Sequence, residues 1–253
     1  MIKIKAFAIG KSDTGLIREL NEDSFLISGF EKGALHGFCI LADGMGGHNA
    51  GEVASAMATE IVSNELLHSD MQGDEDKIVS QIMASLDYAN NEIYRKAVTN
   101  SQNAGMGTTV VVFYLDGDTA YIANIGDSRA YLIEKSSITQ LTSDHSIVQK
   151  LVDSGAITPE EARNHPEKNI ITKALGTEPM EEYDIYEFPV REGDRILLCS
   201  DGLTDMIYDE DIKNIVLSPL SPEEILSALV EKAKENGGRD NITVVLIGFD
   251  KED

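Results

Sequence analysis

The chain has 253 residues and carries 21 Lys and Arg against 44 Asp and Glu, a formal net charge of −23 at pH 7. A chain of this length can bury a sizeable core. Such an acidic surface repels nucleic acid and anionic lipid, which argues against proteins that bind either. Solvation explains most of the carboxylates, but some occupy positions that need a separate explanation.

The N-terminus and the cysteines indicate a cytoplasmic protein. The first residues, MIKIKAFAIGKSDTG, contain no long apolar core and no small-residue cleavage site, so we expect no signal peptide. The apolar runs are of strand length and too short to span a membrane. Cys39 and Cys199 lie in strand-like runs, which indicates packed thiols in a reducing compartment and no disulfide scaffold.

Strand-like runs and two helical patterns follow along the chain. Apolar runs lie at residues 37–43, 108–115, 119–125, 129–133, 195–201 and 242–249. The loop LDGDT at 115–119 predicts a hairpin between two of these runs. Apolar residues recur at helical spacing from Val53 to Leu66 and from Ile78 to Ala97. These two segments predict long amphipathic helices.

Two further helix starts carry the same signature. TPEE from Thr158 and SPEE from Ser221 each have a capping residue, a proline in the first turn and a glutamate at the third position. The helices therefore group between clusters of strands and do not alternate strictly with them. This favours an α+β fold, an antiparallel sheet core with helices packed outside it, over a doubly wound parallel sheet.

Carboxylates from five parts of the chain lie at or beside the predicted strand ends. They are Glu22 and Asp23, Asp43, Asp127, Asp201 with Asp205 just beyond it, and Asp240. An acid at a strand end is also ordinary turn chemistry, so each alone has two equal interpretations. If the strand ends converge, all the acids can stay ionised only around a strong positive charge. Oxygen ligands without a His or Cys cluster select Mg²⁺, Mn²⁺ or Ca²⁺.

The stretch DGMGGHNAGEVAS from Asp43 places several glycines directly after one of these acids. The backbone carbonyl of Gly44 can serve as a metal ligand. Gly46 and Gly47 permit close approach and unusual backbone dihedrals. The alternative is a flexible loop between a strand and a helix.

Seven short motifs follow one another along the chain between Arg18 and Leu246: RELNED, DGMGGHNAGEVAS, MGTTVVV, NIGDSRAY, LTSDHS, LLCSDGLTD and GGRDNITVVL. In this order they closely resemble the metal-dependent protein phosphatases, the type 2C Ser/Thr phosphatases. Each motif is short, but the ordered set is specific, and the acidic positions all match the family pattern. The chain thus resembles a stand-alone bacterial catalytic domain of this family.

The resemblance implies a four-layer α-β-β-α sandwich, with two mainly antiparallel sheets flanked by helix pairs. It implies a single catalytic domain over residues 1–253 with a flap subdomain at about 145–176. Arg163, His165 and Lys168 of the flap are then candidates for contact with the substrate peptide. A plain surface excursion is the alternative for each of them.

The resemblance also implies Mg²⁺ or Mn²⁺, two ions per active site at one edge of the sandwich. Asp43 would bridge both ions, and the Gly44 carbonyl would complete the coordination of one of them. Asp201 and Asp240 would hold the other ion.

A weaker third metal position is implied as well. It corresponds to Asp127 together with Asp201, and Asp205 is a further candidate ligand there. Glu22 and Asp23 would shape the site, mainly through metal-bound waters.

The implied reaction is hydrolysis of phosphoserine and phosphothreonine monoesters by in-line attack of a metal-bridging water, with the ions about 3.5–4 Å apart. No covalent phosphoenzyme is needed, so we expect no nucleophilic side chain. Arg18 is the candidate catalytic and substrate-binding clamp, because a guanidinium grips two phosphoryl oxygens at once. The alternative for Arg18 is a surface ion pair with an acidic neighbour.

His48 is the candidate general acid that protonates the leaving seryl or threonyl oxygen. A structural role, capping the helix that begins near Asn49, is an equal alternative. His145 and His165 are rivals for the acid role. The loop between Asp43 and His48 is longer than in the animal branch of the family.

Three other classes compete with this interpretation. A haloacid-dehalogenase-type phosphatase needs a nucleophilic Asp two residues before the second acid, where CSDG has Cys199 instead. A two-metal nuclease or phosphodiesterase conflicts with the charge of −23. A pseudophosphatase that only binds phosphoproteins would have lost a bridging Asp. We therefore expect phosphorylated proteins as partners, those of a Ser/Thr kinase, and a monomeric signalling enzyme.

Overall fold

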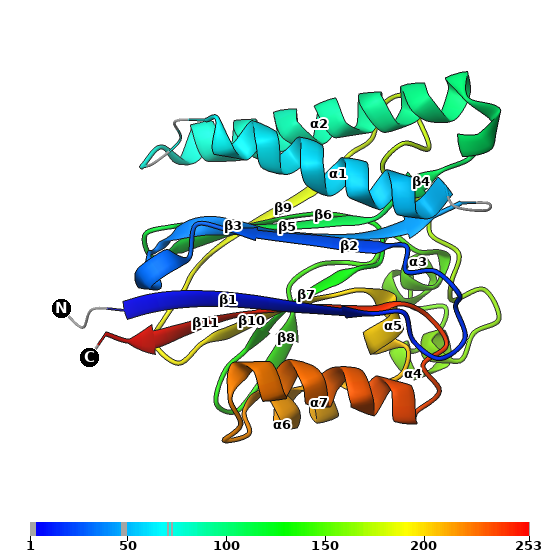
Figure 1. The fold of residues 1–253 in the computed structure, drawn as a ribbon. Helices are drawn as coiled ribbons and strands as arrows, with labels where there is room; N and C mark the ends of the chain where they lie inside the picture. Colours follow the sequence, from blue (N-terminus) through cyan, green and yellow to red (C-terminus); the bar gives the residue numbers. More distant parts are fainter. Residues whose placement is uncertain (1–3, 47–49, 70, 72, 253) are drawn as a thin grey trace.

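The computed structural model describes residues 4–46, 50–69, 71 and 73–252 of the chain. In this part of the chain the elements form four layers: helices, sheet, sheet and helices (Figure 1). The predicted α-β-β-α sandwich is therefore confirmed.

Both sheets are antiparallel in every strand pairing of the described residues. The first sheet has the order β1 (Ile4–Asp13), β11 (Ile242–Lys251), β10 (Arg195–Cys199), β7 (Arg129–Ile133) and β8 (Ile138–Gln140). The second has the order β2 (Asp23–Ser28), β3 (His36–Met45), β5 (Val110–Asp116), β6 (Thr119–Ile125) and β9 (Asp184–Pro189), with β4 (Gly107–Thr108) paired to β3.

The helices cover the outer faces of the sheets. α1 (Ala50–Leu67) and α2 (Glu75–Thr99) lie over the second sheet, and α6 (Asp209–Val216) and α7 (Pro222–Glu235) lie under the first (Figure 1). The short helices α3 (Ile147–Asp153), α4 (Pro159–Arg163) and α5 (Asp201–Thr204) gather at one end of the sandwich. Among the described residues, no helix is both long enough and apolar enough to cross a membrane.

Three hydrophobic clusters join the four layers. In β3, Ile40 packs toward α1 and α2, whereas its neighbours Cys39 and Leu41 pack between the two sheets. This alternation follows from the two-residue period of a strand. A third cluster lies between the first sheet and α5, α6 and α7, and it includes Leu197 and Leu229. Both cysteines are free and buried, as the sequence predicted.

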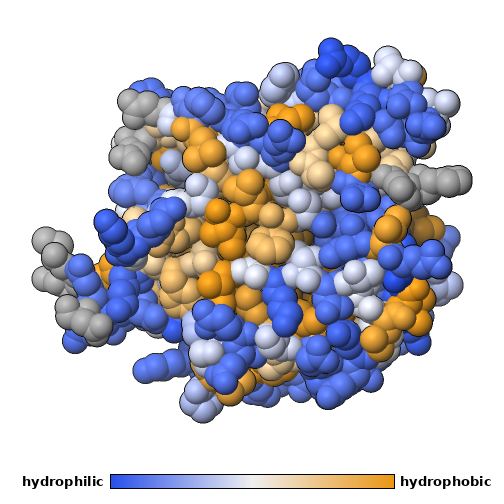
Figure 2. All heavy atoms as spheres, viewed as in Figure 1, coloured by the Kyte–Doolittle hydropathy of each residue, from blue (hydrophilic) through white to orange (hydrophobic). Residues whose placement is uncertain are grey.

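The hydrophobic core reaches the surface in a region of the face drawn in Figure 2. In Figure 2 hydrophobic residues gather over the edge strands β1 and β2, where most side chains are only half-buried. The rest of this face is largely hydrophilic, in keeping with the net charge of −23.

The predicted helices and strands recur in the structure with changed bounds, and three of the changes affect strands near the site. The run at 108–115 is divided into β4 and β5, because Thr109 leaves the ladder to bond Asp43. The run at 37–43 extends to Met45. The run at 195–201 ends at Cys199, so Asp201 lies two residues beyond the strand end. Asp201 is the first residue of α5.

The two proline-led helix starts are confirmed. α4 and α7 each begin with a capping box, at Thr158 and Ser221 respectively. The hairpin between β5 and β6 is also present, with Asp116 paired to Thr119.

The strand directions bring the acid-bearing ends together. β3 ends, and β2 and β11 begin, at the end of the sandwich that lies away from the chain termini (Figure 1). Asp23 and Asp43 are directly opposed in the β2–β3 register. The fold thus places residues from distant parts of the sequence at one end of the two sheets.

Candidate metal centre

Carboxylates from all five predicted positions line one cavity of about 290 Å³ at this end of the sandwich. Its polar lining includes Arg18, Glu22, Asp43, Gly44, Asp127, Asp201 and Asp240. Asp23 and Asp205 are not part of this wall. Asp23 lies behind it, bonded to Ser200, and Asp205 lines a neighbouring cavity.

The backbone of Asp43 is held on both sides by the start of the next strand. Its N–H donates to Thr109 Oγ1 at 3.1 Å, and its carbonyl accepts from Thr109 N–H at 2.9 Å. Thr108 Oγ1 donates to the same carbonyl at 2.8 Å. These bonds fix the point from which the Asp43 carboxylate enters the cavity.

Gly44 allows three backbone segments to meet beside Asp43. A Cβ at Gly44 would lie 2.1 Å from the Gly51 carbonyl oxygen and 2.5 Å from the Glu22 carbonyl oxygen. The Gly44 N–H donates to that Glu22 oxygen at 3.1 Å. Only glycine permits this approach, which brings the first turn of α1 against the cavity.

Asn241 and Ser200 organise the Glu22–Asp23 segment. Asn241 Oδ1 accepts from Glu22 N–H at 2.8 Å, and its Nδ2 donates to the Leu20 carbonyl at 2.9 Å. Ser200 Oγ donates to Asp23 Oδ2 at 2.8 Å. The sequence analysis missed both residues, and it also missed Thr109. The only signal for them was that each stands next to a predicted acid or an apolar run.

The carboxylates at the cavity raise one another's pKa values. Burial, followed by the charges of Asp23 and Asp201, raises the pKa of Asp43 well above its usual range. Burial and the charges of Asp127 and Asp240 do the same to the pKa of Asp201. Burial is also the main cause that raises the pKa of Asp127 to about 7 and that of Asp23 to about 6. The cavity therefore favours a bound cation over free carboxylates.

The donor set fits Mg²⁺ or Mn²⁺. Within the described part of the chain, Glu22 Oε1 and Asp23 Oδ1 are buried without a hydrogen-bond partner. The described residues contain no group of three or more His, Cys, Asp or Glu side chains already closed around one point. The acids instead face a shared cavity from several sides. This suits an ion that is bound through one or two carboxylates and keeps several of its waters.

Arg18 stands at the rim of the cavity with its guanidinium against two acids. Its Nη2 donates to Asp240 Oδ2 at 2.8 Å, and its Nη1 lies 3.8 Å from Glu22 Oε2. The side chain is 47% exposed, so the guanidinium can exchange partners at little cost. In this structure Arg18 therefore forms the ion pair that the sequence analysis kept as its alternative.

Neither rival histidine lines the metal cavity. His145 is buried, with Nδ1 accepting from Gly126 N–H at 3.1 Å and Nε2 3.3 Å from Asp184 Oδ2. His165 lines a separate hollow beside Arg163 and accepts from Glu167 N–H. The preferred candidate, His48, lies outside the described residues.

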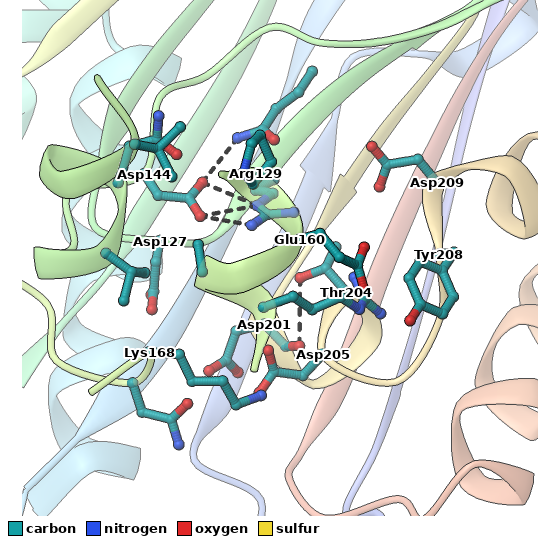
Figure 3. A pocket seen from close by; sticks show the side chains of 18 of the residues that line it. Asp127, Arg129, Asp144, Glu160, Lys168, Asp201, Thr204, Asp205, Tyr208 and Asp209 are labelled. Carbon is teal, nitrogen blue, oxygen red and sulfur yellow. Dashed lines mark hydrogen bonds and ion pairs between the residues drawn. The ribbon is translucent and has the colours of Figure 1, made fainter. Parts of the chain in front are cut away.

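A larger cavity of about 620 Å³ adjoins the metal cavity and shares Asp127, Asn169 and Asp201 with it (Figure 3). α4 forms part of its wall. Lys168 Nζ donates to Asp205 Oδ2 at 2.5 Å. The Arg163 guanidinium lies 4.0 Å above the Tyr208 ring. Two of the three residues predicted to contact the substrate peptide, Arg163 and Lys168, thus line this cavity, and each already has an internal partner.

A sandwich with a carboxylate-lined cavity at one end suits an enzyme that uses metal ions. The profile of the protein phosphatase 2C family matches residues 18–243. The chain belongs to this family and is therefore a protein phosphatase, which confirms the resemblance seen in the motifs.

Curated relatives cover almost the whole chain. The serine/threonine phosphatase stp of Listeria welshimeri is 39% identical over 237 residues, 94% of this chain and 93% of its own length. Protein phosphatase PhpP of Streptococcus pneumoniae is 40% identical over 243 residues, 96% of this chain and 97% of its own.

Solved structures confirm the architecture. The catalytic domain of the serine/threonine protein phosphatase PstP, in complex with two manganese ions, superposes with a TM-score of 0.86 at 36% identity. The match covers 98% of this chain and 100% of that one.

Proposed function

We propose that this protein phosphatase hydrolyses phosphoserine and phosphothreonine in proteins. The observation that carries the proposal is the set of recessed carboxylates around one cavity, with a half-exposed arginine at its rim. The relatives named as serine/threonine phosphatases support the same substrate class.

Asp43, Gly44, Asp201 and Asp240 are the residues we assign to two Mg²⁺ or Mn²⁺ ions. Bound ions would lower the pKa of a water molecule and draw charge from the phosphoryl oxygens. The manganese complex of PstP supports an assignment of two ions. We assign Asp127, with Asp201, to a third and weaker position.

Glu22 and Asp23 act on the ions indirectly, through water molecules. The free Glu22 Oε1 can accept a hydrogen bond from water in the cavity, whereas Ser200 holds Asp23 in place. Their role is to orient water around the ions and not to bind the ions directly. Neither needs to move for this role, because Asn241 fixes the segment that carries both.

Arg18 binds the phosphoryl group of the substrate. Its Nη2 now donates to Asp240 Oδ2, so the guanidinium already points at a residue assigned to a metal ion. The phosphoryl group of a substrate would offer the guanidinium a larger negative charge and a bidentate partner in place of this carboxylate. Arg18 therefore moves from a carboxylate to the phosphate when the substrate binds.

We assign proton donation to the leaving oxygen to His48. The bonding of His145 and the position of His165 argue against either rival. Gly46, which stands two residues before His48 in the sequence, lines the metal cavity.

The larger cavity is the path for the substrate peptide. It opens directly beside Asp127 and Asp201, so residues that flank the phosphorylated side chain reach it. We assign the segment 145–176 as a flap on a single catalytic domain, with Arg163 and Lys168 on its inner side. We further propose a monomeric, cytoplasmic signalling enzyme that opposes a Ser/Thr kinase.

The test is hydrolysis of a phosphothreonine peptide by the purified chain with EDTA or with added Mn²⁺. We expect turnover only with the metal. Turnover that persists in EDTA would overturn the metal assignment. A chain that binds Mn²⁺ but hydrolyses none of several phosphopeptides would be a phosphoprotein-binding module instead.

A further inference from the structure

The turn that carries Asp127 is held by two consecutive residues of another loop, Asp144 and His145. Asp127 lies between β6 and β7, and the loop follows β8. We propose that Asp144 and His145 are positioning residues, which fix this turn and keep the charge of Arg129 away from the Asp127 carboxylate, so that the carboxylate stays free for a cation. The proposal rests on the assignment of Asp127 to a metal position.

His145 fixes the residue directly before Asp127 by two hydrogen bonds. Its backbone N–H donates to the Gly126 carbonyl at 2.9 Å, and its Nδ1 accepts from Gly126 N–H at 3.1 Å. Because Nδ1 accepts, the ring proton sits on Nε2, which faces Asp184 Oδ2 at 3.3 Å. The imidazole is 9% exposed, so the whole ring is committed to this clamp.

The clamped turn has a conformation that needs such support. Gly126 has a φ of +105°, and a Cβ there would lie 2.5 Å from Thr109 Cγ2. Thr109 also bonds Ser128 Oγ at 2.8 Å and accepts from Asp43 N–H. The Asp127 turn is therefore tied to the Asp43 backbone on one side and to His145 on the other.

Asp144 forms an ion pair with Arg129, which lies two residues after Asp127 in the sequence. Arg129 Nη2 donates to Asp144 Oδ2 at 2.7 Å, and Arg129 Nε lies 2.9 Å from Oδ1 (Figure 3). Gln140 Nε2 donates to Asp144 Oδ1 at 2.8 Å. Arg129 Nη1 donates to Tyr131 OH at 2.9 Å. All three nitrogens of the guanidinium thus have hydrogen-bond partners other than Asp127, namely Asp144 and Tyr131.

The two charges of this pair act on Asp127 in opposite directions. After burial, Asp144 is the main cause that raises the pKa of Asp127, and Arg129 lowers it. While the pair is intact, the two contributions oppose each other. Without the Asp144 charge, the guanidinium is unpaired in a poorly solvated place and is free to turn toward Asp127, a carboxylate that its charge already stabilises. It would then compete with a cation for Asp127.

The test is calorimetric titration of the full chain with Mn²⁺. We compare wild type, Asp144→Asn, Asp127→Asn and the double variant. Asp144→Asn should weaken the weakest Mn²⁺ step about tenfold or more, because a freed unit charge then opposes the ion. Asp127→Asn should remove the same step. In the Asp127→Asn background, Asp144→Asn should have no further effect.

Two rescue variants separate positioning from mere stability. Arg129→Gln combined with Asp144→Asn replaces the ion pair by neutral amides, and it should restore the weak Mn²⁺ step that Asp144→Asn loses. His145→Asn keeps an acceptor for Gly126 N–H, so it should retain this step, whereas His145→Ala should lose it. Thermal unfolding of each variant shows whether the fold is intact.

Asp250→Asn is the matched control. It breaks the Arg195–Asp250 pair, also 2.7 Å long, at the end of the sandwich that carries the termini, and should leave the titration unchanged.

The proposal is overturned if Asp144→Asn leaves the weak step unchanged or weakens binding equally in both backgrounds, or if the neutral pair fails to restore the step. A wild-type chain that binds no Mn²⁺ would also overturn it. Because these readouts are binding measurements, loss of phosphatase activity alone would count against the proposed function only.

Discussion

At the scale of single residues, the cavity combines recessed carboxylates with scarce positive charge. Arg18 is the only Lys or Arg side chain that lines the metal cavity in the described residues, against five acids. Burial and mutual repulsion raise the pKa values of Asp43 and Asp201 well above their usual range. A bound divalent ion lowers these pKa values again, because it stabilises the ionised form of each ligand. The cavity is thus built for cations first and for a phosphate second.

Arg18 provides a direct test of the phosphate site. We predict that Arg18→Ala raises KM for a phosphothreonine peptide about tenfold to a hundredfold, because one or two charge-assisted hydrogen bonds of about 1.5–3 kcal/mol are lost. Arg18→Lys should recover only part, since an ammonium cannot bind two oxygens in a fork. Steady-state kinetics measure both effects.

The stability of these variants is the control. The Arg18 side chain is 47% exposed, so losing its pair with Asp240 should change the free energy of unfolding by less than about 1 kcal/mol. An unchanged KM in Arg18→Ala would show that the arginine serves only as a surface partner of Asp240.

At the scale of elements, sequence patterns predicted strands and helices with clear periodicity. The buried runs that became β3, β5, β6 and β11 were found because nearly all their residues are apolar. β1 was missed, since most of its ten residues are half-buried and it contains polar positions and a glycine. β9 ends in proline and lies at a sheet edge, and α5 has only four residues, so neither has a readable period.

The residues of the metal cavity were also predictable only where the sequence pattern was clear. The acids could be predicted because each stands against an apolar run, where a charge is conspicuous. Asn241 could not, because its contacts depend on the loop after β1 folding back to place Leu20 beside it. The opposition of Asp23 and Asp43 in the β2–β3 register likewise depends on a pairing that the sequence does not show.

The contribution of the α7 capping box to the stability of the protein can be measured. Ser221 Oγ accepts from Glu224 N–H, and Glu224 Oε2 accepts from Ser221 N–H at 2.8 Å. We predict that Ser221→Ala lowers the free energy of unfolding by about 1 kcal/mol and leaves kcat and KM unchanged. Chemical denaturation and kinetics test this. A change in kcat would show that α7 influences the active site.

The equivalent change in α4 should have the opposite profile. Thr158 and Glu161 form the same box, but α4 has only five residues and lines the larger cavity. We predict that Thr158→Ala raises KM for a phosphopeptide while turnover of a small aryl phosphate is unchanged, because only the peptide reaches α4. Equal effects on both substrates would contradict a peptide-binding role for this wall.

At the scale of the whole molecule, the charge of −23 and the acidic cavity make stability depend on pH and metal. The pKa of Asp127 is raised by burial to about 7, and that of Asp23 to about 6. In the unfolded chain both return to about 3.9. Between these values the folded chain binds more protons than the unfolded chain, so stability is lost as pH rises.

We therefore predict that the melting temperature in EDTA falls between about pH 4 and pH 7, and that Mn²⁺ restores it. Asp127→Asn should be more stable than wild type at pH 7.5 in EDTA, by about 4 kcal/mol, and nearly equal to it near pH 4. Thermal unfolding of both proteins across this range measures the difference. A difference that does not grow with pH would show that the Asp127 carboxylate is not destabilising when ionised.

The central claim is that the recessed carboxylates hold the ions on which phosphatase activity depends. The most direct measurement compares wild type and Asp43→Asn for Mn²⁺ binding by calorimetry and for phosphothreonine hydrolysis. We predict that wild type binds at least two Mn²⁺ ions. Folded Asp43→Asn should no longer bind two ions, and its rate of phosphothreonine hydrolysis should fall by on the order of a thousandfold. Folded Asp43→Asn that binds and hydrolyses like wild type would contradict the claim.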